Sequence, residues 1–466
     1  MRIERMEADA RKAAGMIRDA GSVLVVSHID ADGITAGSIA ATTLARLGKP
    51  YRIRFEKKMS EDTVSMINGA PEDLVWICDL GSGYLSDFSR PGIVVTDHHV
   101  PDPRWRRKQT VLDDFEDVCH VNPHVYGMDG SREVCGAGMT YVVSKAVDPA
   151  NADLCYLAIV GACGDFQDSD ESRLVGYNRV ILAEAEGLGL VLSEEDVRLF
   201  GRETRNLVQF LQYSGDPVLP GLTENGAGCA DFLAGLGISL GDGGRRRSWC
   251  DLDDAERERA TSALLELAGT PEAARRLFGE VYSVTMHRKG SGLRDAKEFA
   301  TLLNSCGRYD DAETGMRICM GDPSALRDAE RNRAEHRRNI SYALSYVKDR
   351  RLIRERRFIQ YFDSGDEIRE TVVGIVAGMM LNSDSARRDL PMLAFADADD
   401  GTKVSVRADR SLIERGLNLS SVMSTAAGLV GGYGGGHNVA AGATIPPDRK
   451  EEFLDIVEDI ISSQLI

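Results

Sequence analysis

Short apolar segments that end in acidic side chains are the feature of this chain that most restricts its fold. Within the first hundred residues, segments 22–27, 74–78 and 92–95 are rich in β-branched or other large apolar residues, as expected of buried strands. Helix-like segments near 34–47 and 60–68 separate them. Because such an alternation folds into an open parallel sheet, the acids that follow the strands converge at its carboxyl edge, where ligands bind.

The first acidic motif consists of His28, Asp30 and Asp32, between a strand-like and a helix-like segment. A spacing of two places Asp30 and Asp32 on the same side of an extended segment. Carboxylate oxygens together with an imidazole are suitable ligands for a divalent metal. In a simpler interpretation Asp32 caps the helix and Gly33 makes the turn, and this role is compatible with metal binding.

Two further motifs follow the next apolar segments. Asp79 comes directly after segment 74–78, and Asp97, His98 and His99 come soon after Val95. Because neighbouring residues of an extended strand point to opposite faces, one imidazole can bind a metal while the other faces a substrate or holds the loop. Alone, an Asp-His-His sequence is more simply a surface loop with a chance histidine pair. Its position after a strand, like that of Asp79, favours a site.

Length, charge and cysteine content limit the class of protein. The net charge of −17 argues against a basic nucleic-acid-binding face, although metals and local arginine clusters can also bind phosphate. A chain of 466 residues is long enough for two or three domains. Its nine cysteines form no CxxC pair, and no apolar run approaches the ~20 residues of a membrane helix. We therefore expect a cytoplasmic protein with reduced thiols and no membrane partner.

A second chemical motif, Gly-Gly-Gly-His, lies at residues 434–437 and reads as a turn. Consecutive glycines allow a backbone to approach a phosphate closely, because no Cβ intervenes. His437 could donate to a phosphate oxygen, and Arg407, on the strand-like segment 403–407, could bind one bidentately. A flexible linker is the alternative, but the glycines stand between a helix-like and a strand-like segment. The candidate substrate-binding residues are Arg407, Gly434, Gly435, Gly436 and His437.

The order of the acids and histidines resembles the four motifs of the DHH phosphoesterase superfamily. Asp165, at the end of the apolar helix-like segment 154–163, would alone be an ordinary helix-end acid, but it takes the place of the fourth motif. Gly-Gly-Gly-His with Ser-x-Arg upstream resembles the DHH-associated C-terminal domain. The first motif departs from the bacterial RecJ form, since His28 stands where a further Asp is usual. The motif residues are His28, Asp30, Asp32, Asp79, Asp97, His98, His99 and Asp165.

The resemblance implies an α/β fold with an N-terminal parallel-sheet DHH domain, a central mainly helical insertion and a smaller α/β DHH-associated domain. The ~150 residues between the two motif regions, enough for a small domain, make the chain similar to archaeal RecJ-like exonucleases of the GINS-associated type rather than to compact two-domain phosphodiesterases. The predicted parts are a catalytic domain at 1–190, the insertion at 191–330, a connecting helix at 331–352 and a substrate-binding domain at 353–466.

The resemblance also implies the site's chemistry. Two divalent cations would share a water and clamp the scissile phosphate, with Mn²⁺ preferred to Mg²⁺ because the ligands mix imidazole and carboxylate. Asp97 would orient an imidazole, and His99 would contact the phosphate. The implied metal ligands are His28, Asp30, Asp32, Asp79, His98 and Asp165.

The implied function is that of a two-metal phosphodiester hydrolase, a single-strand-specific exonuclease on DNA and/or RNA in replication or repair. Its implied partners are single-stranded DNA or RNA and the GINS replisome complex, docked on the insertion. Three alternatives stay open: an oligonucleotide or cyclic-dinucleotide phosphodiesterase, a replisome scaffold that binds GINS, and a manganese pyrophosphatase. A scaffold predicts eroded motifs, whereas every acid is present here, and a pyrophosphatase typically lacks Gly-Gly-Gly-His.

Overall fold

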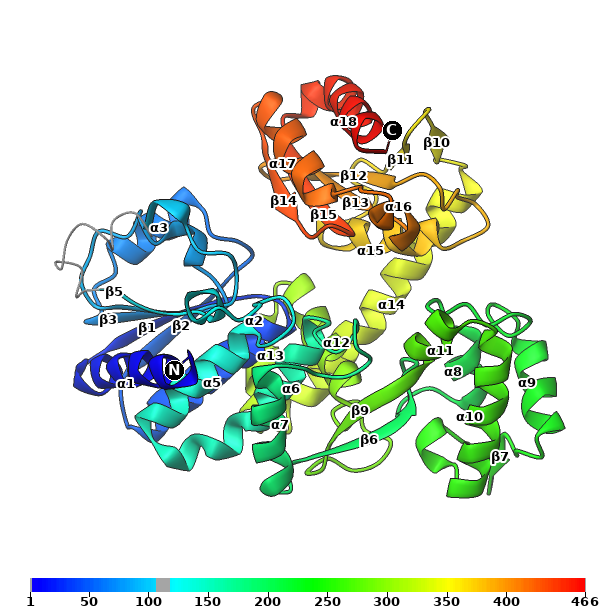
Figure 1. Ribbon diagram of the computed structural model, residues 1–466, viewed down its shortest axis with the longest axis horizontal. Coiled ribbons are helices and arrows are strands. Elements are labelled where there is room, and N and C mark those ends of the chain that lie inside the picture. The colour runs from blue at the N-terminus through cyan, green and yellow to red at the C-terminus, as the bar shows by residue number, and fades with distance from the viewer. Residues whose placement is uncertain (1, 106–117, 466) are drawn as a thin grey trace. The chain divides into compact units, whose positions relative to one another are not determined.

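The structure, a computed structural model, describes residues 2–105 and 118–465 of the chain. The described chain divides into two compact units, Met1–Arg333 and Ala334–Ile466. Figure 1 shows that each unit is built around its own sheet with helices on both faces. We describe each unit by itself, beginning with the one that carries the predicted metal ligands.

A parallel sheet forms the centre of the first unit. Its strands are β1 (Val23–His28), β2 (Tyr51–Glu56), β3 (Leu74–Cys78), β4 (Ile93–Thr96) and β5 (Val118–Val121). The helices around it are α1 (Arg2–Asp19), α2 (Ala31–Arg46), α3 (Glu61–Asn68), α5 (Gly136–Val147), α6 (Cys155–Gly164) and α7 (Tyr177–Gly187). Among the described residues the strand order is β2-β1-β3-β4-β5, and each neighbouring pair is parallel. The predicted parallel α/β domain is confirmed.

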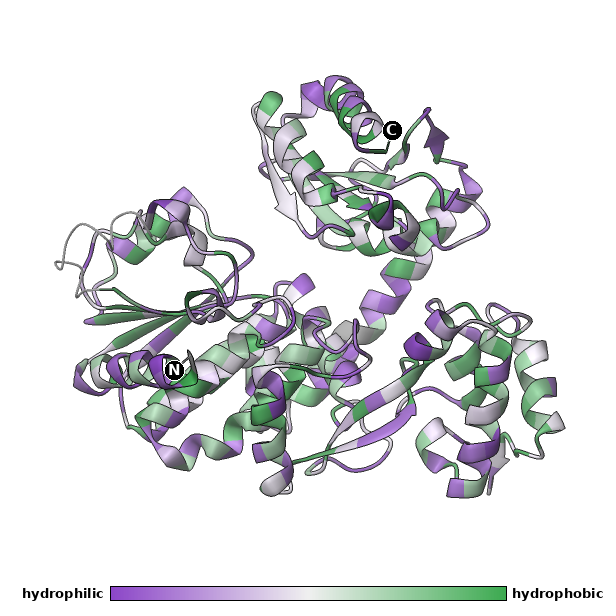
Figure 2. Ribbon diagram, viewed as in Figure 1, coloured by the Kyte–Doolittle hydropathy of each residue, from purple (hydrophilic) through white to green (hydrophobic). Residues whose placement is uncertain are grey.

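Alternate side chains of the strands enter two different cores. Val23 and Val25 pack with α1, α2 and α5, whereas Leu24 and Val26 pack on the α3 side of the sheet. Figure 1 shows the two helical layers, and Figure 2 shows hydrophobic residues along most of the length of these strands. Burial on both faces explains why β1, β3 and β4 read as continuous apolar segments in the sequence.

The central segment has a small core of its own, mainly helical as predicted. It contains α8 (Leu207–Gln212), α9 (Gly226–Gly235), α10 (Asp254–Ala268), α11 (Pro271–Leu277) and the short strands β7 (Gly241–Asp242) and β8 (Arg245–Arg246). Phe210 and Trp249 stack in this core with ring centroids 5.0 Å apart. Two strands that the sequence did not predict, β6 (Val191–Val197) and β9 (Phe278–Val284), pair antiparallel and join this core to the rest of the unit.

Two helices inside the predicted insertion 191–330 pack elsewhere. These are α12 (Ala296–Arg308) and α13 (Ala312–Cys319). Phe299, Leu303 and Cys306 of α12 are buried in the same core as α2 and α6 of the N-terminal domain. The separate core of the central segment therefore spans about residues 197–277, and the helices after it belong to the packing of the N-terminal domain.

The second unit contains a mixed sheet. The strands of this sheet follow α14 (Ala325–Asp349), a long polar helix that overlaps the predicted connecting helix at 331–352. The strands are β10 (Arg354–Glu355), β11 (Gln360–Asp363), β12 (Met392–Ala398), β13 (Gly401–Arg407), β14 (Tyr433–Gly436) and β15 (Ala440–Ile445). The helices are α15 (Glu370–Leu381), α16 (Arg410–Glu414), α17 (Leu419–Leu429) and α18 (Lys450–Leu465). Within residues 334–465 the strand order is β10-β11-β12-β13-β15-β14, with α15 packed on one face and α17 and α18 on the other.

The predicted glycine turn is one difference from expectation in this unit. Residues 434–436 form part of the edge strand β14, which pairs antiparallel with β15. Glycines are poor strand formers, so the sequence alone favoured a turn. The pairing with β15 supplies the hydrogen bonds that hold this segment extended.

Two further features concern the whole described chain. All nine cysteines lie within it, buried and without a disulfide bond. None of the described helices is both long and apolar enough to cross a membrane.

Candidate metal centre

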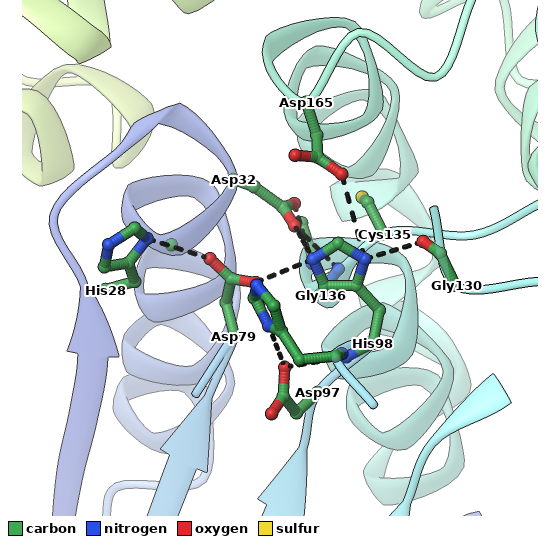
Figure 3. A network of polar contacts seen from close by, with 12 residues as sticks. His28, Asp32, Asp79, Asp97, His98, Gly130, Cys135, Gly136 and Asp165 are labelled. Carbon is green, nitrogen blue, oxygen red and sulfur yellow. Dashed lines mark hydrogen bonds and ion pairs between the residues drawn. The ribbon is translucent and has the colours of Figure 1, made fainter. Parts of the chain in front are cut away.

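Asp79 is the residue around which the predicted ligands gather. It follows β3 in a left-handed backbone conformation with a φ of 56°, held by a 2.8 Å hydrogen bond from its amide to the Thr96 carbonyl. Aspartate tolerates this conformation better than most residues. Its buried carboxylate lies 3.4 Å from Nδ1 of His28 and 3.3 Å from Nε2 of His98. One carboxylate thus lies between two imidazoles that come from different strands (Figure 3).

The first motif is arranged differently from the prediction. Asp30, not Asp32, caps α2, because its carboxylate accepts the Gly33 amide at 2.9 Å. Asp32 lies in the first turn of the helix, so the two acids do not share one side of an extended segment, and that expectation is wrong. The helix starts three residues earlier than the apolar pattern indicated. Asp30 therefore faces His28, at 3.0 Å, while Asp32 points toward a different part of the site.

Asp32 is fastened to the N-terminus of α5. Its carboxylate accepts the amides of Gly136 at 2.7 Å and Ala137 at 2.9 Å. The positive end of the helix dipole favours a carboxylate in this place. Oδ2 of Asp32 also lies 3.8 Å from Nε2 of His98, so one acid joins α2, α5 and the third motif.

His98 has a defined tautomer. Its Nδ1 lies 2.6 Å from the carbonyl oxygen of Gly130, which can only accept, so Nδ1 carries the proton. The opposite nitrogen, Nε2, faces Asp79 and Asp32 (Figure 3), and in the neutral imidazole it carries the lone pair that a metal can bind. A backbone carbonyl that fixes the far side of an imidazole is a common support of metal-binding histidines. The buried His98 side chain is therefore oriented as a ligand.

Asp97 and His99 differ from His98 in exposure and in contacts. Both carboxylate oxygens of Asp97 accept hydrogen bonds, Oδ2 from the Ser82 amide and Oδ1 from the amides of His98 and His99 and from Nδ1 of His99 at 2.7 Å. With its oxygens used in this way, Asp97 holds the loop and orients His99. The His99 side chain is 54% exposed, so it can reach a bound molecule while His98 stays buried.

Asp165 completes the cluster from the end of α6. It is the C-cap residue of that helix, as the sequence indicated, and its Oδ2 lies 3.7 Å from Nδ1 of His98. Gln167 supports it, because its side-chain amide donates to Oδ2 of Asp165 at 3.2 Å and to the Gly130 carbonyl at 2.8 Å. The fourth motif is thus tied to the third through a shared carbonyl.

Within the described residues, the side-chain donors form overlapping groups in which all ligand atoms lie within 4.8 Å of one another. The groups share Asp79 or His98. They are His28, Asp30 and Asp79; Asp32, His98 and Asp165; and Asp79, Asp97, His98 and His99. Every predicted metal ligand is therefore brought into one place.

The electrostatics of the cluster fit a divalent cation. Burial raises the pKa of Asp32 well above its usual range, and the nearby Asp79 carboxylate adds to this effect. Burial also raises the pKa of Asp165. Oδ1 of Asp79 is buried and accepts no hydrogen bond from the described residues. Crowded carboxylates with an unsatisfied oxygen gain from a nearby cation, and carboxylate and imidazole side chains are common ligands of divalent metals.

Three glycines around the cluster were not predicted as site residues. A Cβ on Gly130 would lie 2.0 Å from the His98 carbonyl oxygen, one on Gly136 2.6 Å from the Asp79 side chain, and one on Gly161 2.5 Å from Oδ1 of Asp32. Because glycine has no side chain, each of these positions leaves room for a candidate ligand residue. Gly136 and Gly161 stand in small-residue segments of the sequence, but nothing in the sequence indicates which side chain they face.

Asn122 and Ser82 are also supporting residues that the sequence did not indicate. Asn122 donates from its side chain to the carbonyl of His99 and to Oγ of Ser82, both at 2.9 Å. Ser82 in turn donates its amide to Asp97 at 2.8 Å. Together they fix the loop that carries the third motif.

The predicted substrate-binding residues meet around the start of β15 in the second unit. Arg407 pairs with Ala440 in the sheet register, and the His437 amide donates to the Ala440 carbonyl at 2.8 Å. The glycines differ in role: a Cβ on Gly434 would lie 2.5 Å from the Met423 carbonyl oxygen, whereas no described atom lies within 4 Å of that position on Gly435. Gly434 therefore allows internal packing, and Gly435 leaves open surface beside Arg407 and His437.

Comparison with known proteins finds two matching domain models. The DHH-CID domain matches residues 199–274, which covers most of the separate central core, and the DHHA1 domain matches residues 341–463. These two matches cover most of the central core and most of the second unit, so the chain is similar there to proteins of the DHH superfamily. The chain is 29% identical to an uncharacterised protein of Methanocaldococcus jannaschii over 452 residues, 96% of this chain and 94% of that one.

Solved structures share the fold at low identity. RecJ of Thermus thermophilus in complex with Mn²⁺ has 18% identity and a TM-score of 0.57 over 98% of this chain, which spans 55% of the length of that RecJ. CDC45 of Entamoeba histolytica has 11% identity and a TM-score of 0.66 over 98% of this chain and 99% of that one. An exonuclease RecJ bound to manganese has 17% identity and a TM-score of 0.53, over 97% of this chain and 94% of that one.

Proposed function

We propose that this chain is a metal-dependent phosphodiester hydrolase of the cytoplasm that degrades single-stranded DNA and/or RNA from an end, in replication or repair. The observation that carries the proposal is the convergence of all the predicted ligands on Asp79 in a fold shared with RecJ. Two divalent cations, Mn²⁺ by preference and Mg²⁺ as the second candidate, would be its cofactors. The RecJ structures described as complexes with Mn²⁺ and with Mg²⁺ support this choice.

The proposed ligands fall into two sets, and Asp79 of the first set lies 3.3 Å from His98 of the second. His28 and Asp30 would hold one cation with Asp79, and Asp32, His98 and Asp165 would hold the other. When bound, the cations would lower the pKa of a water and neutralise charge on the scissile phosphate. Asp97 keeps His99 oriented through Nδ1, so that the exposed face of His99 is presented to the phosphate. The ligand roles can be tested one by one by substitution of single acids.

The second unit would bind the terminal nucleotide. Arg407 offers a planar, permanently charged donor group, and a Cβ on Gly374 would lie 2.8 Å from its Nη2, so the glycine makes room for the guanidinium. Arg407 pairs with Ala440 on β15, Gly435 pairs with Gly442 of the same strand, and the His437 amide donates to the Ala440 carbonyl. These features support recognition of a phosphate by charge-assisted hydrogen bonds.

The decisive experiment uses end-labelled single-stranded DNA and RNA with Mn²⁺, resolved on a gel. Stepwise shortening from one end is expected, with a blunt duplex of the same sequence resistant. The matched control is Asp79→Asn, which keeps the shape of the side chain but removes the charge from the centre of the cluster. An equal rate for wild type and Asp79→Asn would reject the proposed site.

A short-substrate phosphodiesterase is the nearest alternative. A series of oligonucleotides from two to about thirty residues, and a cyclic dinucleotide, separates the two functions. An exonuclease is expected to keep or increase its kcat/KM as the strand lengthens. A kcat/KM that is highest for dinucleotides would favour the clearing enzyme instead.

A second candidate function, docking of the GINS complex, is favoured by the central core. This core spans about residues 197–277 and is attached through the paired strands β6 and β9, where Val197 lies opposite Phe278. Because neighbouring strands bring these two positions close together, a short Gly/Ser linker can replace residues 200–276 and leave α12 and α13 in place. We expect the shortened chain to lose GINS in a pull-down and to keep part of its hydrolysis of a short single strand. Retained GINS binding with lost hydrolysis would assign the core to the substrate path.

A further inference from the structure

Phe166 is an exposed aromatic residue at the border of the metal centre. It stands between Asp165 and Gln167, both of which belong to the site, yet its own side chain is 73% exposed. Asp165 lies 3.7 Å from His98, and Gln167 donates to Asp165 and to the Gly130 carbonyl. Because consecutive Cα atoms are about 3.8 Å apart, the side chain of Phe166 leaves the backbone directly beside a candidate ligand.

The backbone at Phe166 is strained. Its φ is 57°, a left-handed conformation that is unfavourable for a bulky side chain. Hydrogen bonds on both sides fix the turn: the Phe166 amide donates to the Cys163 carbonyl, and the Ser169 amide donates to the Phe166 carbonyl. Glycine or asparagine would adopt this turn at lower cost. Neither local conformation nor core packing therefore accounts for an aromatic residue here.

A second exposed apolar side chain borders the same cluster from another loop. Val100 follows His99 directly and is 72% exposed. The ring centroids of His98 and His99 are 4.4 Å apart, and Nδ1 of His98 lies 3.7 Å from Oδ2 of Asp165. The loop that carries Val100 therefore lies close to the segment that carries Asp165 and Phe166. A charged centre with apolar side chains on two neighbouring loops matches a ligand that has an anionic group beside a flat apolar one.

We propose that Phe166 stacks on the nucleobase adjacent to the scissile phosphate and thereby selects nucleic acid over phosphodiesters that lack a base. This inference rests on the proposed function and adds a substrate-contacting residue to it. Every base has a π-face, so stacking on an aromatic ring tolerates any sequence. The enzyme should accordingly show little base preference at this position while still requiring a base.

The test compares wild type with three variants on two substrates. The substrates are a single-stranded oligonucleotide and the same strand with abasic residues at the end that is attacked, both with Mn²⁺. Phe166→Asn suits the left-handed turn and removes the ring, and Phe166→Tyr keeps a ring. Leu188→Ala removes an exposed apolar side chain at the end of α7 and serves as the matched control.

We expect Phe166→Asn to raise KM on the normal strand about tenfold, the equivalent of about 1.4 kcal/mol and within the range for one stacked base. On the abasic strand its KM should stay within about twofold of wild type, because the lost partner is already absent. Phe166→Tyr and Leu188→Ala should behave as wild type on both strands. Mn²⁺ affinity, measured by calorimetry, should be unchanged in all three.

Two results would overturn the inference while leaving the proposed function intact. One is an unchanged KM of Phe166→Asn on the normal strand. The other is an equal loss on the normal and abasic strands, which would mean that the ring does not contact a base. A wild-type chain that neither cleaves the labelled strand nor binds it in a fluorescence anisotropy titration would reject the proposed function and this inference together.

Discussion

Gly136 offers the sharpest test of how the metal centre is built. An alanine there would place its Cβ 2.6 Å from both Cβ and Oδ1 of Asp79 and 2.9 Å from its Cα. Ordinary contact begins near 3.4 Å, so a shift of about 0.8 Å is required, and backbone as well as side chain must move. Rotation of the Asp79 side chain cannot relieve the clash, because Cβ and Cα do not move with it, and the hydrogen bond from the Asp79 amide to the Thr96 carbonyl holds the backbone in place.

The displacement of Asp79 should affect both halves of the cluster. Its carboxylate lies between His28 and His98, so a shift toward one moves it from the other. A misplacement of about 1 Å near reacting groups can cost roughly 10²-fold in rate. Overpacking of this kind typically destabilises the folded state by about 1–3 kcal/mol. We therefore expect Gly136→Ala to lose roughly two orders of magnitude in kcat and to bind Mn²⁺ more weakly.

Calorimetric titration with Mn²⁺ and cleavage of a labelled single strand measure these effects, and thermal unfolding reports stability. Gly15→Ala is the matched control, because no described atom lies within 4 Å of the added Cβ on α1 and alanine favours a helix. Wild-type Mn²⁺ affinity and kcat in Gly136→Ala would refute the idea that this glycine makes room for the central ligand.

Further predictions concern the charge of Asp79, the binding of substrate by Arg407 and the dependence of stability on pH. Asp79→Asn should abolish measurable Mn²⁺ binding in calorimetry with an unchanged circular dichroism spectrum, and unaltered binding would reject Asp79 as a ligand. Arg407→Lys should raise KM for a single strand about tenfold, as expected when a bidentate contact is lost, with normal Mn²⁺ titration; lost Mn²⁺ binding would instead make Arg407 a support of the metal site. In the metal-free chain, burial lowers the pKa of His28 and His98, but the carboxylates of Asp30 and Asp165, among others, raise it well above 6.5. Because the pKa of each imidazole is higher in the folded than in the unfolded chain, protonation of these histidines stabilises the fold. This stabilisation is full below pH 6.5 and is lost as pH rises through the folded pKa. The unfolding temperature of the metal-free chain should therefore fall over that range. Mn²⁺ binding at pH 7 should release protons, seen as a dependence of the titration enthalpy on the buffer, and a buffer-independent enthalpy would contradict protonated imidazoles.

The sequence predicted those strands whose stability comes from complete burial. β1, β3 and β4 are buried on both faces, so their residues form apolar runs that are recognisable without the fold. The strand β6 contains Glu194, Glu195 and Asp196, and its extended form depends on pairing with β9, which begins more than eighty residues later. A short strand with a polar face that pairs so far along the chain gives no local signal.

The site was predicted in its residue types but not in its detailed geometry. Both Asp30 and Asp32 are good N-cap residues, and only the folded backbone decides which one starts the helix. Gly130 could not be identified, because its importance depends on the His98 carbonyl oxygen that packs against it from a distant loop. Residue chemistry can be read from the sequence, whereas steric room depends on which segments the fold brings together.

The way His98 and Asp32 are held has a consequence for the life of the protein in a cell. Gly130 and the start of α5 keep these donors aimed whether or not an ion is present. We therefore expect the chain to keep its native shape without metal, unlike small zinc domains, which unfold without theirs. We expect the proposed hydrolase to stay folded but inactive when manganese is scarce and to regain activity on resupply without new synthesis. Dialysis against a chelator followed by readdition of Mn²⁺ should return full activity within the mixing time.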